Sequence, residues 1–279
     1  MQTLAIAALV SVVPVWAQAG ASKADLLEAL GNAAATFART APGLSADELL
    51  EQRGRIASLQ VLKGSARDIK KLDLQLPSEF VLHRVESSWT LGTASPLHEA
   101  RTVRTIDSLP VDPSHEARHA LTLGLQSPDD DSKKKTLEQL EGGRLQGAAA
   151  DFAPMLLLFT AARQRDYAFS ASGDTRLRYR QIAGDDAFTE FRDRSERSHP
   201  AEGEIWFRES DLLPVRVTLN AEEVLAVGYI LRNEAEVNYT PTRFGLAPST
   251  VIHRQFLNQD LLVENRFSYS GYTGREALP

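Results

Sequence analysis

Residues 115 to 119 have the sequence HEARH, which is the spacing of a zinc-binding helix. On a helix, His115 and His119 lie one turn apart and share a face, so both imidazoles can bind one zinc ion. Glu116 is then placed to act as a general base on a zinc-bound water, and Glu138, which follows His119 after 18 residues, can supply a third ligand. This combination would make a zinc-dependent hydrolase.

Several features of the surrounding sequence argue against zinc at this motif. Arg118 places a cation beside a metal ion that is itself positive. His115 follows Pro113 by two residues, so it falls in the first turn of a short helix, where the helix dipole disfavours a cation. Glu138 lies in a charge-rich stretch that is typical of a solvated helix face. We therefore interpret HEARH as an exposed helix start and expect no metal, no cofactor and no catalytic residue, with the zinc-dependent hydrolase as an alternative.

The remaining histidines do not form a recognisable active site in the sequence. His83, His98, His199 and His253 are scattered, and no serine or aspartate stands near them at the spacing of a nucleophile elbow or a catalytic triad. No glycine-rich loop follows a strand and opens a helix. His83 and His253 fall in predicted strands, so we expect them to be half-buried residues of a sheet.

The composition indicates an ordinary globular protein with little attraction for polyanions. The 279 residues are 43% hydrophobic and 24% charged, the formal net charge is -6 and the pI is near 5.6. We therefore expect no nucleic-acid partner. The chain has no cysteine, so we expect no disulfide, no thiolate zinc ligand and no acylated cysteine that would tether the protein to a membrane.

The first 19 residues predict a secretory signal peptide. An apolar run from Leu4 to Trp16 is too short to span a bilayer, and a small-residue cleavage site, Ala17-Gln18-Ala19, follows it. No Lys or Arg precedes the apolar run, which departs from the usual pattern. We expect a mature protein that begins near Gly20 and is periplasmic or secreted.

Two helices are predicted at the start of the mature chain. Apolar residues recur at helical spacing between Lys23 and Arg39, and a proline and a glycine follow. A second, short helix is predicted for the sequence LSADELLEQR, in which Ser45 and Glu48 have the spacing of a capping box.

A β-hairpin and a helical insert are predicted next. Two runs rich in Val, Thr and Ile, at 79–91 and 98–109, are separated by turn residues and predict the hairpin. The segment 112–160 is predicted to be a helical insert, which ends in a buried helix over the apolar block 148–160.

From Tyr167 to the C-terminus, strand-like runs alternate with turn signals, and their short connections predict antiparallel pairing. In one run, Val215, Val217 and Leu219 are predicted to share the buried face of a strand. The predicted fold class is α+β: a large curved antiparallel sheet, an unclosed half-barrel, with N-terminal helices and the helical insert. We expect residues 20–279 to form a single domain of this kind.

The segment 203–219, GEIWFRESDLLPVRVTL, joins an aromatic strand to an alternating strand through a turn that contains Asp211. It resembles the hairpin of periplasmic lipoprotein carriers of the LolA and LolB type and of envelope-stress sensors of the RseB type. That resemblance implies an unclosed β-barrel covered by helices. Longer stretches, among them TAPGLSADELLEQR, LHEARTVRTIDSLPV and EAEVNYTPTRFGLAPSTVIHRQFLNQDLLVENRFSYS, resemble a family of secreted bacterial proteins of acidobacterial type. This second resemblance covers most of the chain and implies a fold and a location, but no activity.

We interpret the chain as a non-enzymatic protein that binds a hydrophobic or lipid-like ligand, such as an acyl chain or a lipoprotein, in the concave face of a half-barrel. Candidates for the lining are aromatic residues that would equally suit a core: Trp89, Trp206, Phe207, Tyr239 and Phe267. Because affinity would come from buried apolar area, this function needs no polar motif in the sequence. A second alternative is an envelope sensor that binds a partner protein through a sheet edge.

Overall fold

The computed structural model describes residues 21–54, 80–93, 97, 99–110, 151–192, 195–225 and 228–274 of the chain. The predicted signal peptide, the HEARH motif with Glu138, His98 and the helices predicted between 112 and 145 lie outside these residues. Within the described part, the secondary structure consists of one α-helix, two 3-10 helices and thirteen strands.

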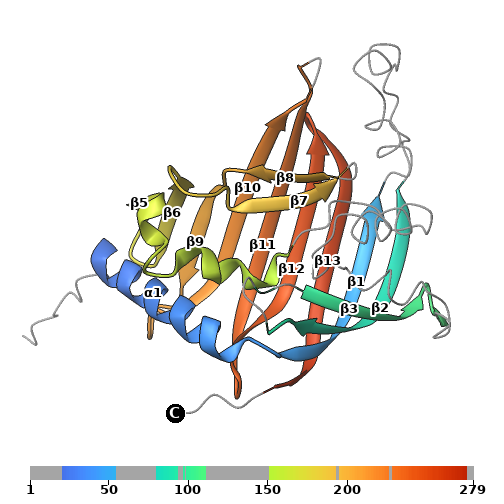
Figure 1. Ribbon diagram of the computed structural model, residues 1–279, viewed down its shortest axis with the longest axis horizontal. Coiled ribbons are helices and arrows are strands. Elements are labelled where there is room, and N and C mark those ends of the chain that lie inside the picture. Colours follow the sequence, from blue (N-terminus) through green and yellow to red (C-terminus); the bar gives the residue numbers. More distant parts are fainter. Residues whose placement is uncertain are drawn as a thin grey trace, which may run out of the picture.

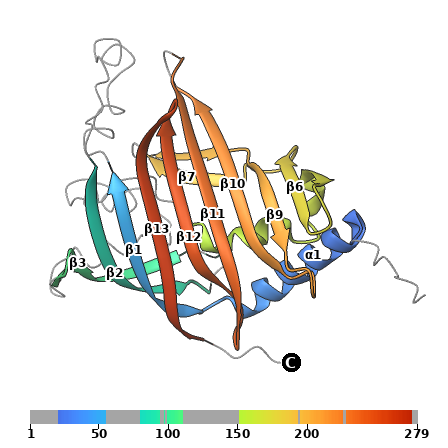
Figure 2. The same cartoon turned by 180° about the vertical axis from the view of Figure 1, so that it is seen from behind.

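Eleven of the described strands form one antiparallel sheet that does not close into a barrel (Figure 1). Its order is β4-β3-β2-β1-β13-β12-β11-β10-β9-β6-β5, so the first strand of the chain pairs with the last (Figure 2). The strands are β1 (Ser45–Gly54), β2 (Val81–Leu91), β3 (Glu99–Ile106), β4 (Leu109–Pro110), β5 (Tyr167–Ala171), β6 (Arg176–Gln181), β9 (Glu202–Phe207), β10 (Pro214–Val224), β11 (Ile230–Thr242), β12 (Gly245–Leu257) and β13 (Asp260–Thr273). The predicted fold class, α+β with a large unclosed antiparallel sheet, is confirmed, and so is the predicted hairpin, which is formed by β2 and β3.

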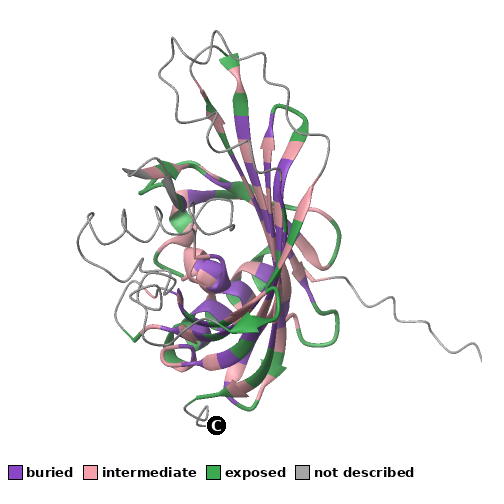
Figure 3. Ribbon diagram, turned by 90° about the vertical axis from the view of Figure 1, so that its right-hand side faces the viewer, coloured by how far each residue is buried: buried purple, intermediate pink, exposed green. Residues whose placement is uncertain are grey.

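The helix α1 (Lys23–Thr40) covers part of one face of the sheet, which we call the inner face (Figure 3). Its N-terminus has a capping box: the Ser22 hydroxyl accepts from the backbone N–H of Asp25 at 3.2 Å, and the Asp25 carboxylate accepts from the backbone N–H of Ser22 at 2.9 Å. Leu26 and Phe37 are fully buried against the sheet side. The helix predicted in this segment is therefore confirmed.

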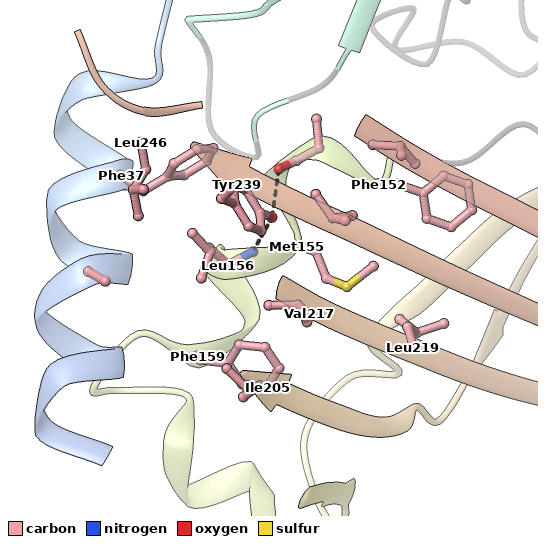
Figure 4. Packing of buried hydrophobic residues seen from close by; sticks show 14 of the residues in the cluster. Phe37, Phe152, Met155, Leu156, Phe159, Ile205, Val217, Leu219, Tyr239 and Leu246 are labelled. Carbon is pink, nitrogen blue, oxygen red and sulfur yellow. Dashed lines mark hydrogen bonds between the residues drawn. The ribbon is translucent and has the colours of Figure 1, made fainter. Parts of the chain in front are cut away.

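The 3-10 helix η2 (Ala153–Phe159) packs against α1 and β12 (Figure 4). The Tyr239 hydroxyl, on β11, donates to the Ala153 carbonyl oxygen at 2.9 Å and accepts from the backbone N–H of Leu156 at 3.2 Å. This bridge satisfies backbone groups of a short helix that would otherwise be buried without partners. The buried helix predicted over the apolar block 148–160 is thus present at its centre, in the 3-10 form. A second short 3-10 helix, η3 (Gln164–Asp166), leads into β5.

The helix predicted for LSADELLEQR is wrong, because this segment forms strand β1. Ser45 does not cap a helix; its hydroxyl lies 2.9 Å from the Thr90 hydroxyl on β2. Glu48, the other member of the expected capping box, is buried on the inner face. β1 pairs with β13 on one side and with β2 on the other, and these two backbone ladders outweigh the helical preference of the local sequence.

The strand β10 confirms the predicted alternation in part. Val217 and Leu219 are buried on the inner face, as expected, whereas Val215 is only partly buried. The pairing of β10 with β9 shifts register between Pro214 and Arg216, and this irregularity takes Val215 out of the regular alternation.

Two further strands, β7 (Phe188–Arg192) and β8 (Ser195–His199), form a separate ribbon that lies across the inner face of the large sheet (Figure 1). Arg197 donates from Nη1 to Glu223 Oε1 on β10 at 2.7 Å, so a partly exposed ion pair joins the ribbon to the sheet.

We expect Phe37→Ala to lower the free energy of unfolding by about 3–5 kcal/mol. The Phe37 side chain is fully buried, and its ring packs edge-on against Tyr239 with the centroids 6.0 Å apart. Urea unfolding measures the change. Asn32→Ala, on the exposed side of α1, is the matched control and should stay within about 0.5 kcal/mol of the wild type. Equal effects of the two substitutions would contradict the packing of α1 on the sheet.

Candidate functional site

The inner face is built from alternate residues of each strand, and its buried apolar side chains form three clusters among the described residues. The largest cluster, the main core, contains the buried sides of α1 and η2 (Figure 4). Two smaller clusters lie outside the main core. One contains Leu50, Val85 and Val103 on β1, β2 and β3, and the other contains Leu231, Leu257 and Leu262 on β11, β12 and β13.

A buried ionic cluster, formed by Glu48, Glu99 and Arg101, lies on the inner face of β1 and β3. Arg101 Nε donates to both carboxylate oxygens of Glu48, at 2.7 Å each, and Arg101 Nη2 donates to Glu99. The three residues are 2%, 1% and 7% exposed, in that order. Since an unpaired charge at such a depth would be strongly unfavourable, the three groups depend on one another.

Further hydrogen bonds connect the ionic cluster to its surroundings. The Ser87 hydroxyl donates to Glu48 Oε1 at 2.8 Å, and Trp89 Nε1 donates to Glu99 Oε2 at 2.8 Å. The other oxygen of Glu99 accepts from the backbone N–H of Ala153 at 2.8 Å. One carboxylate on β3 therefore holds both β2 and the first residue of η2.

The electrostatics of the cluster follow from its depth. Burial raises the pKa of Glu48 against the opposing effect of the Arg101 guanidinium, and the nearby Glu99 carboxylate adds to the rise. Burial lowers the pKa of Arg101, but the two carboxylates beside it hold that pKa well above its ordinary value. Arg101 therefore stays charged, while Glu48 keeps its proton to a higher pH than an exposed glutamate does.

The cluster is suited to positioning more than to reaction. All four carboxylate oxygens of Glu48 and Glu99 accept hydrogen bonds from within the protein, so each is already engaged in holding the fold together. Among the described residues, no group of three His, Asp or Glu side chains is arranged to hold a metal ion.

A row of neutral polar side chains crosses the inner face beside the ionic cluster. This polar row consists of Gln52 on β1, Asn265 on β13, His253 and Gln255 on β12, and Asn233 on β11. Every member is at most 5% exposed. Neighbouring strands place them opposite one another: Gln52 faces Asn265, Asn265 faces His253, and Gln255 faces Asn233.

Four of the five aromatic residues predicted to line the concave face do lie on the inner face. Trp89, Phe207 and Tyr239 are buried in the main core, where Trp89 packs against Tyr269 with ring centroids 5.0 Å apart. Phe267 is partly buried and contacts both the main core and the smaller cluster on β1, β2 and β3.

Trp206 does not line the concave face. Its neighbours Ile205 and Phe207 are buried in the main core, so alternation along β9 turns Trp206 to the outer face. There the guanidinium carbon of Arg216 lies 3.8 Å from the centroid of the indole ring. The aromatic character of the segment was recognised in the sequence, but the side of the sheet was not.

The outer face also carries a cleft of about 530 Å³, at the end of the sheet formed by β5, β6, β9 and β10. Four charged side chains contribute to its walls: Arg178, Arg180, Glu202 and Glu204. Arg178 and Glu204 form an ion pair at 2.8 Å. Such walls are a poor lining for a hydrophobic ligand, so this cleft is not the predicted site.

His83 and His253 lie in strands, as predicted, but only His83 is half-buried, because His253 is 1% exposed. His83 lies in β2, with Nδ1 2.9 Å from Asp107 Oδ2, and its side chain is 10% exposed. His253 lies in β12 and is a member of the polar row. The ionic cluster and the rest of the row were missed, because the residues from 46 to 52, ADELLEQ, alternate in burial but not in polarity.

The fold defines the class of this protein as an unclosed antiparallel sheet whose inner face is covered by an N-terminal α-helix. No protein-family model matches the chain, and no curated protein matches it. Among solved structures, the chain is similar to a LolA superfamily protein from Nitrosomonas europaea, with 11% sequence identity, a TM-score of 0.34, and coverage of 91% of this chain and 94% of that chain. The resemblance to secreted bacterial proteins of acidobacterial type stays a prediction. In the part of the chain that the structure describes, no helix combines the length and apolar character needed to cross a membrane.

We expect Arg101→Met to lower the free energy of unfolding by about 3–5 kcal/mol, because two buried carboxylates lose their counter-charge. Arg104→Met on the same strand is the matched control. Its guanidinium lies 2.8 Å from Asp47, but the two side chains are 47% and 57% exposed, so this change should cost less than about 1 kcal/mol. Urea unfolding of both variants measures the two changes. Equal losses in the free energy of unfolding would show that the buried ionic cluster stabilises the fold no more than an exposed ion pair does.

The raised pKa of Glu48 predicts a pH dependence. The folded protein holds this proton more tightly than the unfolded chain, in which a glutamate has a pKa of 4.5. The stabilising contribution is therefore fully present below that pH and is lost as the pH rises through the folded-state pKa. We expect the free energy of unfolding of the wild type, minus that of Glu48→Gln, to fall as the pH rises above the unfolded-state pKa of 4.5. Urea unfolding across this range measures the difference, and a rise with pH would mean that Arg101 outweighs burial.

Proposed function

We propose that this chain is a non-enzymatic binding protein, periplasmic or secreted, that holds a hydrophobic or lipid-like ligand against the inner face of its half-barrel. An acyl chain, free or carried by a lipoprotein, is the ligand class that the proposal names. The location is inferred from the apolar run and cleavage pattern of residues 1–19.

The observation that carries this proposal is the pair of small apolar clusters outside the main core. α1 and η2 belong to the main core and to neither of the smaller clusters. The inner face is therefore lined by apolar side chains beyond the helices that cover it, and the six residues of the two clusters are at most 9% exposed. Apolar side chains on the inside of an open sheet are the lining that a hydrophobic chain requires.

Of the residues predicted to line the site, Phe267 supports the proposal most directly. It is partly buried, it joins the main core to the cluster on β1, β2 and β3, and the Arg101 guanidinium carbon lies 4.9 Å from its ring centroid. Trp89, Phe207 and Tyr239 act chiefly in the core. Each methylene of a bound chain would contribute about 0.8 kcal/mol on burial, so a long chain can be held without an ionic contact.

Native mass spectrometry of residues 20–279, purified from a bacterial periplasm without added metal or chelator, tests the proposal. We expect a lipid-sized adduct on the wild type. Val103→Gln, which places an amide in the cluster on β1, β2 and β3, should lose the adduct because the apolar surface is interrupted. Thr102→Gln, the exposed neighbour on the same strand, is the matched control and should keep it.

Circular dichroism of both variants verifies that they are folded before their adducts are compared. A bare mass for the wild type, or an adduct that Val103→Gln keeps, would contradict binding at this surface. A stoichiometric zinc adduct that is lost in His115→Ala would instead support the zinc-dependent hydrolase.

A further inference from the structure

The polar row interrupts an inner face that is otherwise largely apolar. Along β12, His253 and Gln255 stand between the buried Val251 and Leu257. A buried amide that lacks a hydrogen-bond partner costs about 1–3 kcal/mol, whereas aliphatic side chains at the same positions would pack without that cost. The row therefore requires a reason beyond the packing of the sheet.

From Gln52 to Asn233, the hydrogen bonds of the row run in one direction. Gln52 Nε2 donates to Asn265 Oδ1 at 2.7 Å, and Asn265 Nδ2 lies 3.4 Å from His253 Nδ1. His253 Nε2 lies 3.1 Å from Asn233 Oδ1. Since an amide nitrogen only donates and an amide oxygen only accepts, His253 accepts at Nδ1 and donates at Nε2, which is the neutral imidazole.

The row ends at an acceptor that no described residue fills. Gln255 Nε2 donates to Asn233 Oδ1 at 3.2 Å, so Asn233 Oδ1 accepts from Gln255 as well as from His253. Gln255 Oε1, in contrast, has no hydrogen-bond partner among the described residues, and Gln255 is 1% exposed. A buried carbonyl oxygen of this kind is completed by one N–H or O–H donor from outside the row.

We propose that the polar row is a subsite for a neutral hydrogen-bond donor on the ligand, an amide N–H or a hydroxyl, with Gln255 Oε1 as its acceptor. This inference rests on the proposed function, because the apolar remainder of the same ligand would lie on the clusters at either side of the row. A charged group does not fit. The row contains no charged side chain, and the neighbouring ionic cluster is already paired internally.

The described cover of the row is aromatic. The Phe152 ring lies over His253 with centroids 4.8 Å apart, Phe188 stacks on Phe152 at 5.9 Å, and His199 stacks on Phe188 at 6.3 Å. This column of rings connects the floor of the sheet to the ribbon of β7 and β8. A polar floor beside an aromatic wall is the usual composition of a site that orients a small polar group on an apolar ligand.

Two uncharged probes of equal chain length test the subsite: dodecanamide, which carries N–H donors, and methyl dodecanoate, which carries none. Native mass spectrometry titrations give the ratio of their affinities for each protein. In Gln255→Met, which keeps the size of the side chain and removes the acceptor, we expect the amide-to-ester ratio to fall about tenfold. The affinity for methyl dodecanoate should stay within about twofold.

Ile252→Met, on the opposite face of the same strand, is the matched control and should keep the wild-type ratio. Gln255→Ala provides a second variant without the acceptor if Gln255→Met does not fold. If neither Gln255 variant changed the amide-to-ester ratio, the subsite would be overturned, because the ligand would then not donate to Gln255 Oε1. Binding of both probes to the wild type would still leave the proposed function standing. If the wild type bound neither probe, both proposals would fail.

Discussion

The pairing of Arg101 with two buried carboxylates is the constraint on which the inner face depends. Glu48 and Glu99 can both be buried only while the guanidinium lies between them, and this fixes the register of β1, β2 and β3. A slip of one residue would turn the charges outward and the apolar neighbours with them. Because Glu99 also accepts from the backbone N–H of Ala153, the same carboxylate determines where η2 begins.

The position of η2 in turn organises the main core. The Tyr239 hydroxyl closes the hydrogen bonds of η2, and the same ring receives the edge of Phe37 from α1. One sheet residue thus holds both helical elements in place. The two helices cover the part of the inner face nearest to them, while the polar row and the two smaller apolar clusters lie beyond.

The sequence predicted the elements whose local and tertiary preferences agree. The N-terminal helix has apolar residues at helical spacing, and in the C-terminal half strand-like runs are separated by turn signals. Residues 45–54 were misassigned because their local pattern favours a helix and the partners that make them a strand lie at β2 and β13, distant in sequence. Trp206 was placed on the wrong face because the alternation of β9 has to be anchored by a known core residue, such as Ile205, before the faces can be assigned. The polar row joins residues up to 213 positions apart, so no local pattern reveals it.

The ionic cluster and the polar row of the inner face differ in how completely their hydrogen bonds are satisfied. In the ionic cluster each oxygen of Glu48 and Glu99 has a donor, although burying two carboxylates is the more demanding task. In the polar row, which shares β1 with that cluster, one neutral oxygen of Gln255 has none in the described structure. An unfilled acceptor contributes nothing to the packing of the sheet itself. The complete cluster is therefore the structural one, and the incomplete row is the part of the face where we propose the ligand subsite.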